Sequence, residues 1–324
     1  MKWDELGKSE TAHYSRDLLA MNVLAPSRYV KASDYTHSMF IIIEALLAKD
    51  LAYVHDGWVY YSVRSDRDFG KLAEAGGYEG YASWLATANE RGNNPHDARK
   101  RDPLDFVLWQ GQAPGEPAWD SPWGRGRPGW HIECSAMATA LLGPRIDIHG
   151  GGGDLIFPHH TCEIAQSEHA TNERPFVGHW MHCAMVYQDG QKMSKSLGNL
   201  TLISNLLRSY SADAIRIMLL GHHYRSVWEY HPDDMRASSE FAAELAAATR
   251  EASDAEPSGS ARAAFISAME NDLDVPAALE VLRALLGRAH ESPAEAAELR
   301  ALAAVLGLTL GGQPDATPWP SPWS

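Results

Sequence analysis

Apolar residues in the first part of the chain follow helical spacing in two stretches and strand-like runs in two others. Residues 8–21 and 35–49 have apolar side chains at three- and four-residue spacing, which predicts helices. Asp56-Gly57 separates two runs of β-branched and aromatic residues, 51–54 and 58–63, and this arrangement predicts a β-hairpin.

The next stretch contains one predicted strand between two irregular connections. Residues 105–109 are rich in apolar and aromatic side chains and predict the strand. Residues 70–101 are rich in glycine, asparagine and charge, and residues 111–129 are rich in proline and glycine. Such compositions are typical of connections without regular structure.

Strands and helices alternate in the middle of the sequence. Strands are predicted at 145–149 and within 176–186, and helices at 134–142 and 158–171. Two strand–helix units of this kind indicate an α/β fold, half of a nucleotide-binding, Rossmann-like domain, with its ligand at the carboxyl ends of parallel strands.

Helical patterns dominate after residue 200. Two helices are predicted at 200–210 and 212–220, and an Ala-rich all-α domain follows at 236–252, 261–271, 276–289 and 293–306. The Pro- and Trp-rich tail 311–324 is expected to be disordered. The expected segments are 1–100, 101–200, 201–240, 241–310 and 311–324.

Composition narrows the protein class further. The net charge of −14 counts against a large nonspecific nucleic-acid footprint, although local basic faces remain compatible with tRNA. Three cysteines without a C-x-x-C pair argue against a disulfide framework and fit a reducing compartment. The start of the sequence is unlike a signal peptide, and no apolar run approaches the length of a membrane span, so a cytoplasmic location is expected.

Candidate metal ligands occur in the alternating region. His159 and Glu163 are four residues apart and share one face of the predicted helix, and Cys134 precedes them on another element. Sulfur, imidazole and carboxylate together suit zinc better than magnesium or calcium. The alternative is a buried free cysteine beside an ordinary helical His–Glu pair.

Two further stretches have ligand-binding character. Gly150 to Gly153 follow a predicted strand, where a backbone without side chains approaches a ligand closely, and Asp154 is placed to accept hydrogen bonds from ribose. Lys192 and Lys195 form a charge pair suited to a triphosphate on a mobile loop. The alternatives are a flexible glycine loop and a solvated surface loop.

These stretches together resemble cysteinyl-tRNA synthetases, which are class I aminoacyl-tRNA synthetases. The matching words are Pro-Gly-Trp-His-Ile-Glu-Cys-Ser (128–135), His-Gly-Gly-Gly-x-Asp-Leu-x-Phe-Pro-His-His (149–160), Glu-Ile-Ala-Gln-Ser (163–167), Trp-Met-His (180–182) and Lys-Met-Ser-Lys-Ser-Leu-Gly-Asn (192–199). They occur in the family's order and spacing. The cysteine ligase of mycothiol synthesis, which joins cysteine to an amino sugar, is a close relative with similar motifs.

The resemblance implies roles for particular residues. Cys134, His159 and Glu163 correspond to three of the family's four zinc ligands, and the zinc would hold the thiolate of substrate cysteine. Trp130 resembles a wall of the amino-acid pocket. The ATP site, with Mg²⁺ accompanying ATP, would include His149, Gly151, Asp154 and Lys195. Lys192 and Lys195 would act in catalysis.

The resemblance also has departures. It begins at about Trp3, and neither the family's first zinc-ligating cysteine nor its His-Ile-Gly-His-type ATP motif occurs. Thr161-Cys162 replaces the family's usual Glu-Asn. Residues 1–100 would then be the end of the first nucleotide-fold half plus an insertion, 101–200 the second catalytic half, 201–240 stem-contact helices and 241–310 an anticodon-side helical domain.

Three functions follow from this comparison. The first is ATP-dependent activation of L-cysteine and its ligation to tRNA(Cys). The second is the same activation with an amino-sugar acceptor. The third is a non-catalytic truncated paralogue, or a half that works with a separate N-terminal half, and it implies that the chain alone activates cysteine poorly.

Overall fold

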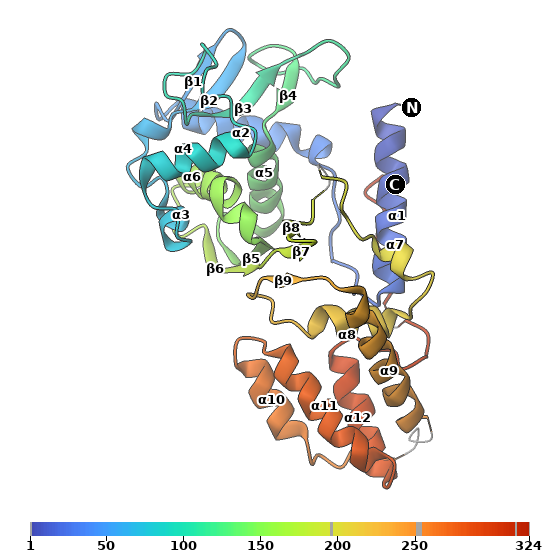
Figure 1. Cartoon of the computed structure of the whole chain (residues 1–324). Coiled ribbons are helices and arrows are strands. Elements are labelled where there is room, and N and C mark those ends of the chain that lie inside the picture. Colours follow the sequence, from blue (N-terminus) through green and yellow to red (C-terminus); the bar gives the residue numbers. More distant parts are fainter. Residues whose placement is uncertain (1, 195–196, 251–254, 315, 324) are drawn as a thin grey trace. The chain divides into compact units, whose positions relative to one another are not determined.

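The computed structural model describes residues 2–194, 197–250, 255–314 and 316–323 (Figure 1). It divides into two compact units, Val30–Cys183 and Met1–Tyr29 with Ala184–Ser324. The segments expected from the sequence stay predictions. The first helix belongs with the C-terminal part, and Met21 and Val23, which follow this helix, pack into the hydrophobic core of that unit.

An antiparallel four-stranded sheet forms one part of the unit Val30–Cys183. Its order is β1 (Ala52–His55), β2 (Trp58–Tyr61), β3 (Phe106–Gly111) and β4 (Gly126–Pro128). The predicted hairpin is confirmed, and its turn residues Asp56 and Gly57 both have positive φ, 49° and 76°. β4 lies within the stretch predicted to be irregular. It is short and carries Gly126, where an added Cβ would lie 2.1 Å from the carbonyl oxygen of Gln110.

The same unit contains five α-helices in its described residues, and they share a core with the sheet. They are α2 (Thr36–Leu47), α3 (Lys71–Ala75), α4 (Gly80–Glu90), α5 (Trp130–Leu142) and α6 (Thr161–Thr171), with short helical segments at Ala32–Tyr35, Val63–Ser65, Gly153–Leu155 and Ile156–His160. α2, α5 and α6 pack against one another. Met39, Ile43 and Ile132 are fully buried in the core that they share with the sheet.

The predicted parallel strands are present as β5 (Ile146–Gly152) and β6 (Val177–Cys183). Their register pairs Gly150 with Met181 and Gly151 with His182, so three of the four consecutive glycines are strand residues and not a loop. Composition suggested a loop because glycine is uncommon within strands. Close packing explains why glycine stands at this place in the strand, since a Cβ on Gly151 would lie 2.8 Å from Cε1 of His160.

The other unit is mainly helical. Its helices are α1 (Trp3–Ala20), α7 (Ile203–Leu206), α8 (Ala212–Leu220), α9 (Pro232–Ala248), α10 (Arg262–Glu270), α11 (Val275–Ala289) and α12 (Pro293–Val305). β7 (Val186–Gln188), β8 (Gln191–Lys192) and β9 (Trp228–Glu229) form a small sheet. The long helix expected at 200–210 is only the single turn α7. Ile215, Phe241, Leu282 and Leu299 lie in the core.

The C-terminal tail differs from the expected disorder in its described residues. Trp319 packs edge-on against Tyr14 and Tyr29, with ring centroids 6.1 and 5.3 Å apart, and its Nε1 donates to the carbonyl of Val23. The backbone N–H of Ala316 donates to Asn22. The aromatic surface of the tail gives it contacts that a purely polar tail would lack. Among the described residues, no helix has the length and apolar character needed to span a membrane.

Candidate metal centre

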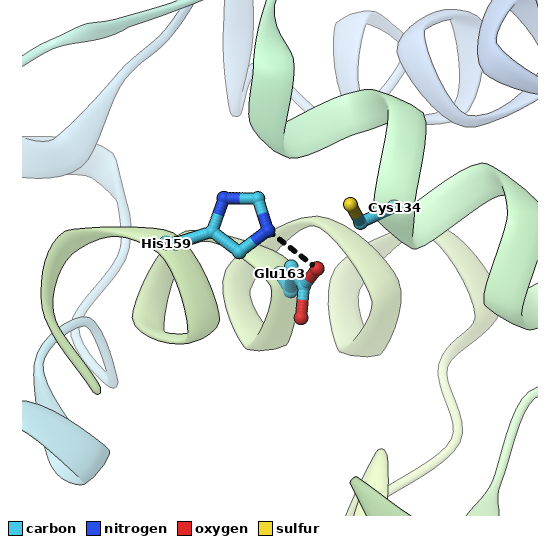
Figure 2. A group of neighbouring side chains, drawn as sticks. All are labelled: Cys134, His159 and Glu163. Atoms are coloured by element: carbon cyan, nitrogen blue, oxygen red, sulfur yellow. Dashed lines mark ion pairs between the residues drawn. The ribbon is translucent and has the colours of Figure 1, made fainter. Parts of the chain in front are cut away.

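The three predicted metal ligands converge in the unit Val30–Cys183 (Figure 2). Cys134 lies in the second turn of α5, His159 in the short helical segment Ile156–His160 before α6, and Glu163 in the first turn of α6. Their ligand atoms are all within 4.8 Å of one another, and His159 Nε2 is 3.1 Å from Glu163 Oε1. The four-residue spacing and the packing of α5 on α6 bring them together.

Local packing fixes the start of α5. Gly129 precedes the helix in an extended conformation, and a Cβ there would lie 2.0 Å from the carbonyl oxygen of Val107. Ile132 and Ala136 then face the core and are fully buried. The helix begins at Trp130, earlier than the sequence pattern indicates, and half-buried Cys134 is directed towards α6 (Figure 2).

Glu163 is the most unusual group of the site. Its side chain is completely buried, and neither carboxylate oxygen accepts a hydrogen bond of normal geometry. His149 Nε2 lies 3.2 Å from Oε2, on the side opposite His159. A buried carboxylate without such bonds is costly, and a bound cation would offset that cost. The set of sulfur, nitrogen and oxygen donors therefore fits a zinc ion.

Burial determines the protonation of the neighbouring groups. It raises the pKa of the Cys134 thiol to about 12, with Glu163 adding to the effect, so the thiol is protonated at neutral pH until a metal displaces the proton. Burial lowers the pKa of His131 and of His160 to about 3, and it also lowers the pKa of His149. These imidazoles are neutral at pH 7.

Further histidines surround the three ligands, and the sequence interpretation assigned most of them no role. His131 Nδ1 is 2.8 Å from His159 Nδ1, and His160 Nδ1 is 2.8 Å from His182 Nε2. His149, expected at the ATP site, lies against Glu163 and forms with His160 and Glu163 a second group able to hold a metal. The available signals were the position of His160 beside His159 and that of His182 in the Trp-Met-His word.

The other predicted binding residues occupy different positions. Trp130 is 59% exposed, and its ring centroid is 4.3 Å from that of His159, so it lies beside the metal candidates. Asp154 lies in the helical segment after β5, and its backbone carbonyl accepts a hydrogen bond from Arg91. The roles of both residues in substrate binding stay predictions.

The paired-lysine loop belongs to the other unit. Lys192 ends β8, and the Asn199 side chain donates to the Lys192 carbonyl and accepts from the Ser194 N–H. Lys195 lies outside the described residues. The catalytic roles of Lys192 and Lys195 stay predictions.

Comparison with known proteins identifies the family. A sequence model described as "tRNA synthetases class I (C) catalytic domain" matches residues 1–240. The chain belongs to this family. Membership confirms the resemblance seen in the sequence and the expected α/β fold followed by a helical region.

Individual members of the class I synthetase family are similar to most of the chain. A cysteine–tRNA ligase of Hydrogenovibrio crunogenus is 44% identical over 298 residues, 90% of this chain and 63% of that protein. An L-cysteine:1D-myo-inositol 2-amino-2-deoxy-alpha-D-glucopyranoside ligase of Thermomonospora curvata is 39% identical over 95% of this chain and 75% of that protein. The chain spans 63–66% of the length of the first three cysteine–tRNA ligases that it matches.

Solved class I structures share the fold. Mycobacterium tuberculosis methionyl-tRNA synthetase in complex with methionyl-adenylate aligns with a TM-score of 0.56 and 16% identity, over 95% of this chain and 76% of that one. At this identity, the likeness supports the architecture alone.

Proposed function

We propose that this chain takes part in ATP-dependent activation of L-cysteine to cysteinyl-adenylate and its ligation to tRNA(Cys). The observation that carries the proposal is the buried carboxylate of Glu163, which has no normal hydrogen bond and lies within a Cys–His–Glu set. The similarity to cysteine–tRNA ligases supports the choice of substrate.

Each site residue has a part in the proposal. Cys134, His159 and Glu163 would hold zinc, which supplies a soft Lewis acid for the thiolate of cysteine and disfavours serine, because a hydroxyl is a weak zinc ligand. Trp130 lies with its ring beside that of His159 and would bound the amino-acid pocket. His149 lies against Glu163 and keeps the carboxylate oriented.

The nucleotide would be bound by other groups. We assign Asp154 to the ribose, Gly151 to the region of close backbone approach, and His149 to the edge of the ATP site. Lys192 and Lys195 would neutralise the phosphates of ATP, whose Mg²⁺ accompanies it. No His-x-Gly-His sequence occurs in residues 1–324, so we propose that full activation also uses an ATP-binding segment outside these residues.

The acceptor has a second candidate. The Thermomonospora curvata relative is named as a ligase of cysteine and an amino-sugar inositol, and it matches 95% of this chain. Both reactions begin with the same adenylate. Product analysis with tRNA(Cys) and with glucosaminyl-inositol, supplied separately to the activated system, distinguishes them. We favour tRNA because the first three relatives are cysteine–tRNA ligases.

Cysteine binding can be tested without ATP. The chain loaded with Co²⁺ should gain thiolate-to-metal charge-transfer absorption when cysteine is added, and serine should produce no change. Cys134→Ala should weaken Co²⁺ binding. An equal response to serine and cysteine, or no response of the loaded chain, would contradict the proposed substrate.

Activation is tested by cysteine-dependent ATP–pyrophosphate exchange. The assay compares the chain alone with the chain mixed with the part of the Hydrogenovibrio crunogenus ligase that lies outside the matched residues. We expect exchange to rise on mixing and to require cysteine. Metal-dependent cysteine binding without exchange in either case would favour a non-catalytic paralogue.

A further inference from the structure

A groove of about 340 Å³ lies in the helical unit, lined mainly by α10 and α12. Its base contains Phe265 of α10 and Leu302 of α12, which are 3% and 7% exposed. Its rims carry Ile266 and Val305, which are 42% and 64% exposed. Large apolar side chains at this exposure indicate a surface that contacts another apolar group.

The two helices contribute lining residues at the same spacing. α10 provides positions 262, 265, 266 and 269, and α12 provides positions 298, 301, 302 and 305. α10, α11 and α12 pack consecutively (Figure 1) and have short connections, so α10 and α12 run in the same direction. Two parallel ridges form a trough suited to a third helix. The lining covers about 10 Å along each helix, or about two turns of an occupant.

Glu298, at one end of this groove, has a buried carboxylate oxygen that lacks a hydrogen-bond donor in the described part of the chain. Its side chain is 3% exposed, Oε2 accepts a hydrogen bond from the Gly259 N–H at 3.1 Å, and Oε1 has no hydrogen-bond partner among the described residues. Burying a carboxylate oxygen without a donor is unfavourable. An occupant that brings a cationic donor to this end would remove that cost.

Other charged groups lie at the rims. Arg262 is exposed and lines the groove. It lies at the Glu298 end, because Gly259, only three residues before it, donates a hydrogen bond to Glu298. Glu270 is exposed at the opposite end of α10. Buried Glu298 and exposed Glu270 therefore complement a helix that carries two cationic side chains about two turns apart. Arg262 can pair with a carboxylate on the same helix, next to the cation that contacts Glu298.

We propose that this groove binds a cationic amphipathic helix of a protein partner. An adjacent pair of apolar side chains on that helix contacts Phe265 and Leu302. A lysine or arginine one turn away donates to Glu298 Oε1. The site is separate from the metal centre, which belongs to the other unit.

The probe is a phage-displayed library of helical 14-residue peptides selected on the full chain. Val305→Lys places a charge at the groove rim, and Val227→Lys is the matched control, since Val227 is 65% exposed in the same unit and does not line the groove. We expect selected peptides to carry lysine or arginine one turn from an apolar pair. They should bind Val305→Lys about tenfold more weakly and Val227→Lys unchanged.

A second substitution tests the charge. Glu298→Gln preserves an acceptor for the Gly259 N–H, and it should weaken the selected peptides about tenfold while leaving their norleucine analogues unaffected. Thermal melts establish that each variant is folded. Lack of enrichment, cation-free peptides, or equal binding to Val305→Lys would overturn the proposal. Concentration-dependent self-association that only Val305→Lys abolishes would overturn it in favour of a second copy of this chain as occupant.

Discussion

Glu163→Gln should change stability in opposite directions without and with metal. Without metal, glutamine removes a completely buried charge that has no normal hydrogen bond, so the variant should be more stable than the wild type. Replacing an uncompensated buried charge by a neutral group is expected to gain about 1–3 kcal/mol. With zinc, the variant lacks an anionic ligand and should gain little stability from the metal.

The size of the metal effect follows from mass action. Zinc at a hundred times its Kd stabilises the wild type by about 2.7 kcal/mol. If the substitution weakens binding about a hundredfold, the same zinc concentration contributes only about 0.4 kcal/mol. For a unit of this size, the wild-type Tm should therefore rise by about 5–10 °C and that of the variant by about 1 °C.

Differential scanning calorimetry with and without zinc measures both quantities, and Glu168→Gln is the matched control. Glu168 is also buried on α6, but it accepts from the Phe176 N–H at 3.0 Å and pairs with Lys71. Its substitution should lower the stability of the metal-free protein and leave the zinc-induced shift unchanged. An equal zinc shift in Glu163→Gln and the wild type would refute the assignment of Glu163 as a ligand.

Three further predictions test other parts of the structure. Gly151→Ala should lose about 1–3 kcal/mol, because its Cβ would lie 2.8 Å from His160, whereas Gly150→Ala, with its nearest atom at 3.6 Å, should be nearly neutral in chemical denaturation. Trp319→Ala removes two aromatic contacts, which together stabilise the packing of the tail by about 1–3 kcal/mol. Hydrogen exchange in α1 should therefore become faster, and unchanged exchange there would contradict the packing of the tail. Although burial raises the pKa of Asp66, hydrogen bonds from neighbouring groups outweigh it and hold the pKa below 3.8, so the carboxylate stabilises the fold above pH 3.8 and less as the pH falls below it. The stability difference between the wild type and Asp66→Asn should therefore shrink in acid-denaturation series.

Periodicity predicted the helices well where one face of the helix is buried. α2, α8 and α11 begin and end within about two residues of their expected limits. Periodicity failed where contacts distant in sequence decide the conformation. The glycines at 150–152 extend a strand because β6 pairs with them, and the short strand β4 exists because β3 lies beside it.

Basic residues give a second example of contacts that the sequence does not show. Arg99 and Arg101 belong to the basic run Arg99-Lys100-Arg101, whose charge alone indicates a solvated surface. In the structure, the guanidinium of Arg99 lies 3.7 Å from the ring centroid of Trp58, and that of Arg101 lies 4.0 Å from that of Tyr53. Both aromatic residues are on the hairpin β1–β2, more than forty residues earlier in the chain. Pairings at this separation depend on the folded sheet.

In the candidate site, too, some features could be predicted from the sequence and others are visible only in the folded structure. Motif words specified Cys134, His159 and Glu163 as ligands, and helical spacing placed His159 beside Glu163. The family resemblance, by contrast, implied that His149 lies at the ATP site. Only the folded structure shows that its imidazole lies against the carboxylate of Glu163.

The fold itself explains why the carboxylate of Glu163 remains without a normal hydrogen bond. Eight consecutive residues, Thr161 to Glu168, are buried, so α6 cannot turn Glu163 towards water without exposing its neighbours. α5 packs against this helix and carries Cys134, while His159, in the segment Ile156–His160 that packs against the start of α6, lies beside the carboxylate. The positions of the ligand atoms are therefore set by burial of apolar surface before any metal binds, and the cost of the buried charge becomes part of the affinity for a cation.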